Sequence, residues 1–152
     1  MSQEQNIVDQ LINKFGYLQD KVKIQRQRRM YCEVALVNFE EVFAYAIKDL
    51  GFAHLCTITG LDEQDNIGII YHLAREDGIM LNLKTALPKS DPILKSIIER
   101  FPSAEIYERE MVDLLGVKVE GLPEGYRYPL VDDWPKGQYP LRKDWKLDTG
   151  GN

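Results

Sequence analysis

The hydrophobic residues recur at helical spacing in four stretches of the chain. Apolar side chains three or four positions apart predict helices at residues 7–15, 39–50, 91–101 and 104–115. Gly16, Gly51 and Gly116 each follow one of these stretches, as is typical of helix ends. The helix at 91–101 is expected to begin at Asp91-Pro92, because proline suits the first helical position.

Alternating apolar and polar residues predict strands between the helices. Residues 21–27 and 31–37 flank a turn at Arg28-Arg29 and predict a hairpin. Short polar segments join three further strand-like runs and predict an antiparallel meander, at residues 54–60, 66–74 and 79–87. We therefore expect an α+β fold, with a mostly antiparallel sheet of about five strands and helices packed on it.

Both periodicities end near Gly121. The residues beyond it hold four of the seven prolines, both tryptophans and three of the eight tyrosines. Disordered tails are poor in aromatic residues, whereas Trp, Tyr and Arg dominate the centres of protein interfaces. We therefore expect a compact domain at residues 1–119 and an extended arm at residues 120–152. The composition leaves two uses of the arm open: it packs on a partner protein, or it wraps its own domain.

Composition and charge narrow the classes of function. A chain of 152 residues suits one domain. Its net charge of −5 argues against nucleic-acid binding, which needs a strong positive field. No apolar run approaches the roughly 20 residues that span a bilayer, and the N-terminus has no signal-peptide pattern. Cys32 and Cys56 make no disulfide framework, so a reducing, cytoplasmic setting is expected.

Sequence motifs for catalysis or metal binding are missing. The chain has no CxxC pair, no phosphate-binding glycine loop and no nucleophile elbow. Cys32, Cys56, His54 and His72 each fall in a predicted strand, where a buried or interface side chain is the expected role. We therefore expect no catalytic residue, no metal site and no cofactor in this chain.

Two clusters of charge remain to be explained. The basic cluster lies on the predicted hairpin and comprises Lys21, Lys23, Arg26, Arg28 and Arg29. It is expected to be a solvated face, or else a contact for a partner or an anionic headgroup. The second cluster lies on the predicted helix 104–115 and comprises Glu105, Glu108, Arg109, Glu110 and Asp113. Its expected role is pairing with neighbouring charges; a free-standing adaptor, or a small enzyme using Glu108–Asp113 for proton transfer, is the alternative.

Three strings near the C-terminus are more specific: EREMVDLLGV, EGLPEGYRYPLVDDW and PLRKDW. Together they resemble the signature of the 30 kDa-type subunit family of complex I, the NADH–quinone oxidoreductase. GFAHLCTITGLD, YHL and FPSAEIYERE agree with that family more loosely. The resemblance implies an interface with a partner subunit at Glu108, Arg109, Glu110, Asp113, Arg127, Trp134, Leu141, Arg142, Lys143 and Asp144.

The resemblance implies a cofactor-free structural and assembly subunit in the hydrophilic arm of a membrane-bound oxidoreductase complex. It implies a peripheral position on the cytoplasmic side of the membrane, which the chain reaches only through the complex. The expected partners are a large subunit that holds the NiFe or quinone site and a small iron–sulfur subunit. Iron–sulfur clusters, and NiFe or quinone, are expected in those partners, and the isolated chain is expected to be inactive.

Departures from the family's pattern favour one type of complex. Leu122 stands where many respiratory members have histidine, and the chain ends eight residues after Asp144, without their longer extension. These features favour an energy-converting hydrogenase type, with the NADH–quinone oxidoreductase type as the next expectation.

Overall fold

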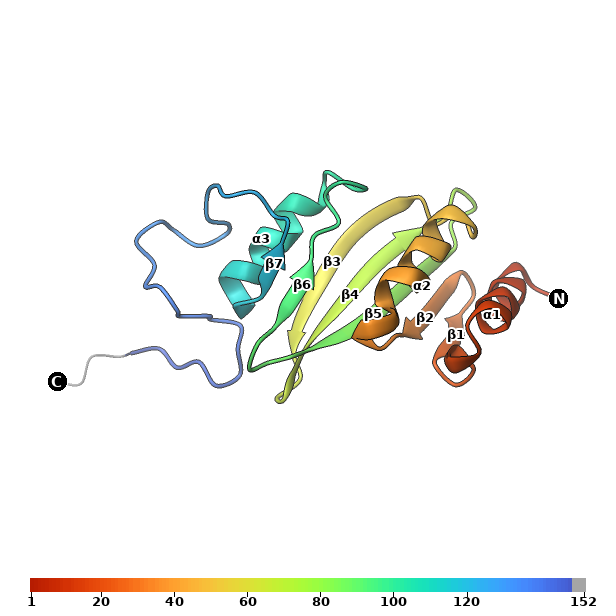
Figure 1. Cartoon of the computed structure of the whole chain (residues 1–152), viewed down its shortest axis with the longest axis horizontal. Coiled ribbons are helices and arrows are strands. Elements are labelled where there is room, and N and C mark those ends of the chain that lie inside the picture. The colour runs from red at the N-terminus through yellow and green to blue at the C-terminus, as the bar shows by residue number, and fades with distance from the viewer. Residues whose placement is uncertain (149–152) are drawn as a thin grey trace. The chain divides into compact units, whose positions relative to one another are not determined.

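The computed structural model describes residues 1–148, and its elements confirm the predicted α+β fold (Figure 1). The chain divides into two units, one of residues 1–59 and 68–86, the other of residues 60–67 and the chain from 87 onward. The elements are α1 (Gln3–Lys14), a 3₁₀ turn (Gly16–Leu18), β1 (Val22–Arg26), β2 (Arg29–Glu33), α2 (Leu36–Lys48), β3 (His54–Asp62), β4 (Asn66–Ala74), β5 (Met80–Pro88), β6 (Ile93–Lys95), α3 (Ala104–Leu115) and β7 (Lys118–Glu120).

The five-stranded sheet has the order β1-β2-β5-β4-β3. The predicted hairpin is confirmed: β1 and β2 are antiparallel, and Arg28 turns between them with a φ of 60°. The predicted meander is confirmed as well, since β3, β4 and β5 are neighbours joined by short turns. The sequence did not predict that β2 and β5 pair in parallel. A parallel pair requires a crossover connection, and here α2, β3 and β4 lie between the two strands in the chain.

The core of the first unit lies between α2 and the sheet. Phe39 and Phe43 of α2 pack on the ring of Tyr71, with ring centres 5.0 and 5.4 Å away. Along β4, every second side chain is fully buried, as at Ile67, Ile69, Tyr71 and Leu73. Fully burying a side chain of this size stabilises the folded state by roughly 1.5–3 kcal/mol. These four side chains are therefore the main apolar contribution of β4 to the core.

His72, a polar residue within β4, is held by neighbours on the sheet. Its Nε2 lies 2.8 Å from Thr59 Oγ1 and its Nδ1 lies 2.7 Å from Asn82 Oδ1. Asn82 in turn donates to the carbonyl of Met30. Both ring nitrogens of His72 are therefore engaged in hydrogen bonds across the sheet.

The predicted helix at residues 91–101 is wrong. Residues 93–95 instead form β6, which pairs in parallel with β7. The amide of Lys118 donates to the carbonyl of Pro92, and the amide of Ser96 donates to the carbonyl of Glu120. Isoleucine, frequent in this stretch, has only modest helix propensity, so pairing with a distant strand outweighs the local apolar pattern.

The start of α2 also differs from the sequence-based prediction. The strand expected to reach residue 37 ends at Glu33, and α2 begins at Leu36, three residues before the predicted start at residue 39. Leu36 and Val37 account for the error because they are apolar yet exposed, Val37 to 88%.

Cys32, predicted to be a buried free thiol, is completely buried in β2. Burial raises the pKa of this thiol to about 12. Because the thiolate is the reactive form, we expect Cys32 to resist a maleimide reagent at pH 8 in the folded protein and to react once the chain is denatured. Mass spectrometry of the labelled peptide measures this, and rapid labelling under native conditions would contradict it.

Candidate functional site

The second unit is organised around α3 and the segment that follows β7, which we call the arm (residues 120–152, described to 148). Helix α3 ends at Gly116, whose φ of 72° is left-handed and whose amide donates to the carbonyls of Met111 and Val112. Figure 1 shows the arm passing alongside α3. Hydrogen bonds join the arm to α3 and to the end of β3.

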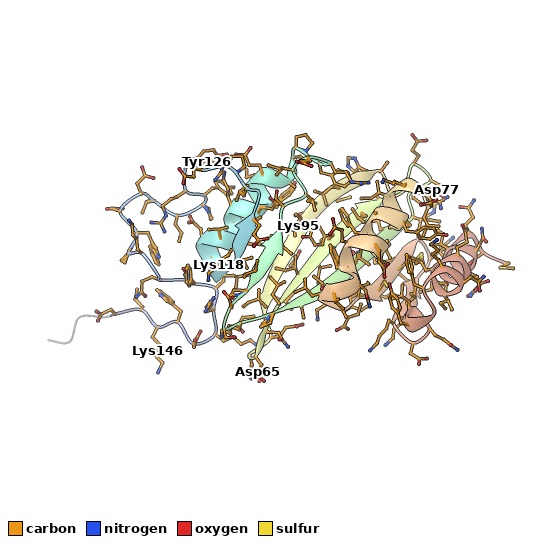
Figure 2. All side chains as sticks on the ribbon, viewed as in Figure 1. Asp65, Asp77, Lys95, Lys118, Tyr126 and Lys146 are labelled. Atoms are coloured by element: carbon orange, nitrogen blue, oxygen red, sulfur yellow. The ribbon has the colours of Figure 1, made fainter. Side chains whose placement is uncertain are left out.

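Arg109 holds the beginning of the arm. Its Nε and Nη2 donate to Glu105 Oε1 at 3.1 and 2.9 Å, and Nη2 also donates to the carbonyl of Pro123 at 2.9 Å. The guanidinium lies 5.0 Å from the ring centre of Tyr126, a residue labelled in Figure 2. A Cβ at Gly125 would come within 2.9 Å of Nη2, so glycine permits this close approach. The side chain of Arg109 is only 8% exposed.

Asp113, one turn further along α3, holds the middle of the arm. Its Oδ1 accepts from Arg127 Nε at 3.3 Å, and its Oδ2 accepts from the amide of Leu130 at 3.1 Å. Arg127 also donates through Nη1 to the carbonyl of Trp134 at 2.7 Å. Both oxygens of a buried carboxylate are thus used, which is what a charge needs when it is removed from water.

The C-terminal end of α3 holds the PLRKDW string. The amide of Leu141 donates to the carbonyl of Leu114 at 3.0 Å, and Arg142 Nε donates to the carbonyl of Leu115 at 2.7 Å. These are carbonyls that a helix end leaves without an internal partner, and a cation there complements the helix dipole. The ring of Tyr139 covers Gly116, where an added Cβ would lie 2.5 Å from the ring.

Asp62, at the end of β3, fastens the next two residues. It accepts from Lys89 Nζ at 2.7 Å and from the amides of Lys143 and Gln64, each at 2.8 Å. Lys89 also lies 3.2 Å from Asp144 Oδ1. Burial disfavours the charged form of Asp62, but these hydrogen bonds outweigh it and lower its pKa to about 2.

Glu108 is completely buried and binds the turn after β6. Its Oε2 accepts from Ser96 Oγ at 2.7 Å and its Oε1 accepts from the amide of Ile97 at 2.8 Å. Burial raises the pKa of Glu108, and the two hydrogen bonds counter only part of that effect. Glu110 is half-buried on the same helix.

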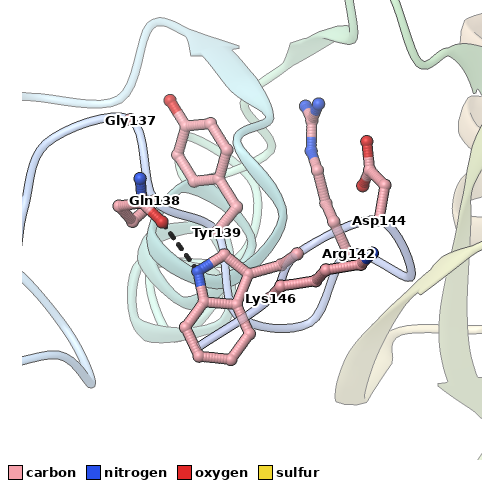
Figure 3. A pocket seen from close by; sticks show the side chains of 7 residues that line it. Gly137, Gln138, Tyr139, Arg142, Asp144 and Lys146 are labelled. Atoms are coloured by element: carbon pink, nitrogen blue, oxygen red, sulfur yellow. Dashed lines mark hydrogen bonds between the residues drawn. The ribbon is translucent and has the colours of Figure 1, made fainter. Parts of the chain in front are cut away.

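The outer part of the arm folds on itself. Trp134 Nε1 donates to the carbonyl of Gln138, and Trp145 Nε1 donates to Gln138 Oε1, the bond dashed in Figure 3. The centres of the two indole rings lie 6.0 Å apart. A shallow groove of about 280 Å³ opens here, lined by Gly137, Gln138, Tyr139, Arg142, Asp144, Trp145 and Lys146.

The structure brings together most of the residues singled out from the sequence, and it gives many of them contacts within their own chain. The interface with a partner subunit stays a prediction, as does the division into residues 1–119 and 120–152. Sequence reasoning missed Asp62, Lys89 and Tyr139. The available signal was that Asp62 ends GFAHLCTITGLD, one of the strings that resemble the family.

The described part of the chain lacks two kinds of feature. Among residues 1–148, no three His, Cys, Asp or Glu side chains group in a way that could hold a metal ion. No helix within that range has the length and apolar character needed to cross a membrane.

Residues 32–150 match the family described as "Respiratory-chain NADH dehydrogenase, 30 Kd subunit". The chain belongs to this family. It is 33% identical to a subunit of the F(420)H(2) dehydrogenase of Methanosarcina mazei, over 92% of this chain and 90% of that one. It is 28% identical to the beta subunit of the membrane-bound hydrogenase of Pyrococcus furiosus, over 96% and 88%. The resemblance inferred from the sequence is therefore confirmed.

The fold of this family member has solved counterparts. A chain in the structure of the membrane-bound sulfane sulfur reductase, an archaeal respiratory membrane complex, superimposes with a TM-score of 0.82 at 29% identity, covering 96% of this chain and 87% of that one. A trypsin-resistant fragment of Nqo5 shares the fold, with a TM-score of 0.67 at 23% identity, covering 80% and 98%.

The contacts of Asp62 predict a pH-dependent contribution to stability. Because its pKa is lower in the folded chain than the ordinary 3.8, its stabilisation is present above that value and is lost as the pH falls toward about 2. We expect Asp62→Asn to lower the free energy of unfolding by about 1–3 kcal/mol at pH 7, and by progressively less below about pH 4. Chemical denaturation of both proteins across this pH range measures the difference.

The matched control is Asp65→Asn, an exposed aspartate on the turn that follows Asp62 (Figure 2). It should change stability by less than about 0.5 kcal/mol at any of these pH values. An effect of Asp62→Asn that does not vary with pH would contradict the ionic role of this carboxylate.

Gly116 and Gly137 both have left-handed backbone angles, but only Gly116 is covered by a ring. Replacing either with alanine should cost about 1–2 kcal/mol through the backbone. Gly116→Ala should cost more, because its Cβ would meet Tyr139. Thermal unfolding compares the two variants, and the added Tyr139→Ala substitution should reduce the excess. Equal losses would show that Tyr139 does not press on the helix end.

Proposed function

We propose that this chain is a structural and assembly subunit of a membrane-bound oxidoreductase complex. The observation that carries the proposal is the arm: two strings of the family signature, EGLPEGYRYPLVDDW and PLRKDW, fold onto α3, which contains most of the third, and they leave apolar side chains exposed. Large exposed apolar groups that gather on one segment mark sites of association with another protein. The relatives reported above belong by name to multi-subunit enzymes, which supports the same role.

The proposed partners are a large subunit that holds a NiFe or quinone site and a small iron–sulfur subunit. The chain itself holds no cofactor in this proposal and reaches the membrane, on its cytoplasmic side, only through the complex. It supports electron transfer coupled to ion translocation by keeping the large subunit in place. The energy-converting hydrogenase type is favoured, consistent with the likeness to a membrane-bound hydrogenase subunit, and the NADH–quinone type comes next.

The alternative of a small enzyme built on Glu108–Asp113 has little support from the geometry. Glu108 and Arg109 are buried, and Asp113 is 7% exposed. Their polar atoms are engaged in hydrogen bonds within the chain. A general acid or base must reach its substrate, so we assign these residues a structural role.

We expect an affinity-tagged chain, purified from detergent-solubilised native membranes, to bring down a large and a small redox subunit that mass spectrometry identifies. A variant that ends at Glu120, and so lacks the arm beyond it, should lose both partners and yet keep the circular dichroism of a folded sheet. Recovery of the full chain without any partner would contradict the proposal. A large subunit with NiFe-binding cysteines would distinguish the hydrogenase type from the quinone type.

A further inference from the structure

We infer that the arm recognises its partner through exposed apolar side chains, the first of which is followed by two acids, while the charged signature residues act inside the chain to hold the arm in its docking shape. This inference rests on the proposed function, because it concerns how the same arm meets the same partner. It separates two groups of residues that the sequence alone places in one interface.

The first group consists of positioning residues. Arg109 and Asp113 are each 7% exposed and bind three successive parts of the arm, at Pro123, Arg127 and Leu130. A partner subunit could use these charges only by breaking hydrogen bonds that already satisfy them. Leaving a buried charge without its partner is costly, so their contacts belong to the arm's own shape.

The second group consists of apolar side chains on the outside of the arm. Val131 is 63% exposed, Leu141 54% and Leu147 67%. A single exposed apolar residue needs no explanation, but these three belong to one segment, whose backbone is bound to α3 at Leu130, next to Val131, and at Leu141. A segment that is ordered before it binds loses less entropy on docking than a flexible one.

The charges beside two of these apolar residues differ. Val131 is followed by the exposed acids Asp132 and Asp133. Leu147 lies between the exposed Lys146, which is toward the end of the arm in Figure 2, and the exposed Asp148. Complementary charge sets the orientation of a docked surface. The partner that fits is therefore a protein surface with an apolar recess bordered by Arg or Lys to receive Val131, and with further apolar surface to receive Leu141 and Leu147.

The test uses the full tagged chain in its native complex, with hydrogen exchange of each purified variant as a second readout. Val131→Asp and Leu147→Asp should each reduce the partner subunits recovered from solubilised membranes by about tenfold or more, with amide exchange in the arm unchanged. The matched control is Val37→Asp, which changes a more exposed valine at the start of α2. It should leave recovery unchanged.

Asp113→Asn tests the positioning role, because it removes the charge that binds Arg127 and weakens the acceptor of the Leu130 amide. We expect the exchange rate of the Leu130 amide to rise by about tenfold, together with reduced recovery of the partners, and Asp113→Glu to restore part of both. Unchanged exchange and unchanged recovery in Asp113→Asn would overturn the positioning role.

The sign of the charges beside Val131 has its own variant. Asp132→Lys combined with Asp133→Lys should reduce partner recovery, more strongly at low salt than at high salt. If the variants of Val131, Leu147, Asp132 and Asp133 all recover the partner subunits normally, and the partners are lost only when the arm is deleted, this inference is overturned and the proposed function stands. Normal recovery after deletion of the arm would overturn the proposed function itself.

Discussion

A charge that is removed from water must be paired, and α3 carries three such charges on a helix of twelve residues. Glu108 meets this need with Ser96 and Ile97 in the turn after β6. Asp113 meets it with groups of the arm, and Arg109 divides its donors between Glu105 and the arm. Helix, β6 turn and arm therefore depend on one another, because each buried charge loses hydrogen bonds if its segments separate.

This dependence changes the meaning of the family signature. A signature rich in charged residues on a helix suggests a surface that binds another protein through ion pairs. In the structure the same residues bind carbonyls, amides and side chains of the following segment. Hydrogen bonds of this kind require particular donors at particular places, since the nitrogens of one arginine reach both a carboxylate and a carbonyl. Apolar docking contacts tolerate more variation in residue type. The charged residues, glycines and prolines can therefore match the family's signature, whereas the apolar residues proposed to dock on the partner need not match it.

Local pattern predicted the parts of the fold that are determined locally. The hairpin of β1 and β2, the three strands of the meander and the extent of α3 all follow from period and turn residues. The pairing of β6 with β7 did not, because a three-residue strand has no detectable period and its partner lies more than twenty residues away. The pairing of β2 with β5 was also missed, since no local signal reports a parallel neighbour.

The candidate site was likewise predicted as a set of residues but not as a geometry. Arg109 and Asp113 were identified, yet their burial depends on where the arm lies, and an arm without periodicity gives no prediction of its path. Asp62 was overlooked because its partners, Lys89 and Lys143, lie 27 and 81 residues away in the chain.

The geometry also indicates when the arm acquires its shape. Its hydrogen bonds are to α3, to the end of β3 and within itself, and all of these groups belong to this chain. In the proposed docking, the shape is therefore available before the partner arrives, and binding supplies only the apolar contacts and the charge contacts beside Val131. In the proposed docking, an arm bound to α3 at Leu130 and Leu141 presents Val131 and Leu141 at a set separation. A partner with one matching recess would gain one contact, whereas a partner with both gains them at the entropic cost of a single docking event. In this proposal, specificity comes from the spacing that the buried charges of α3 maintain, even though those charges need not touch the partner.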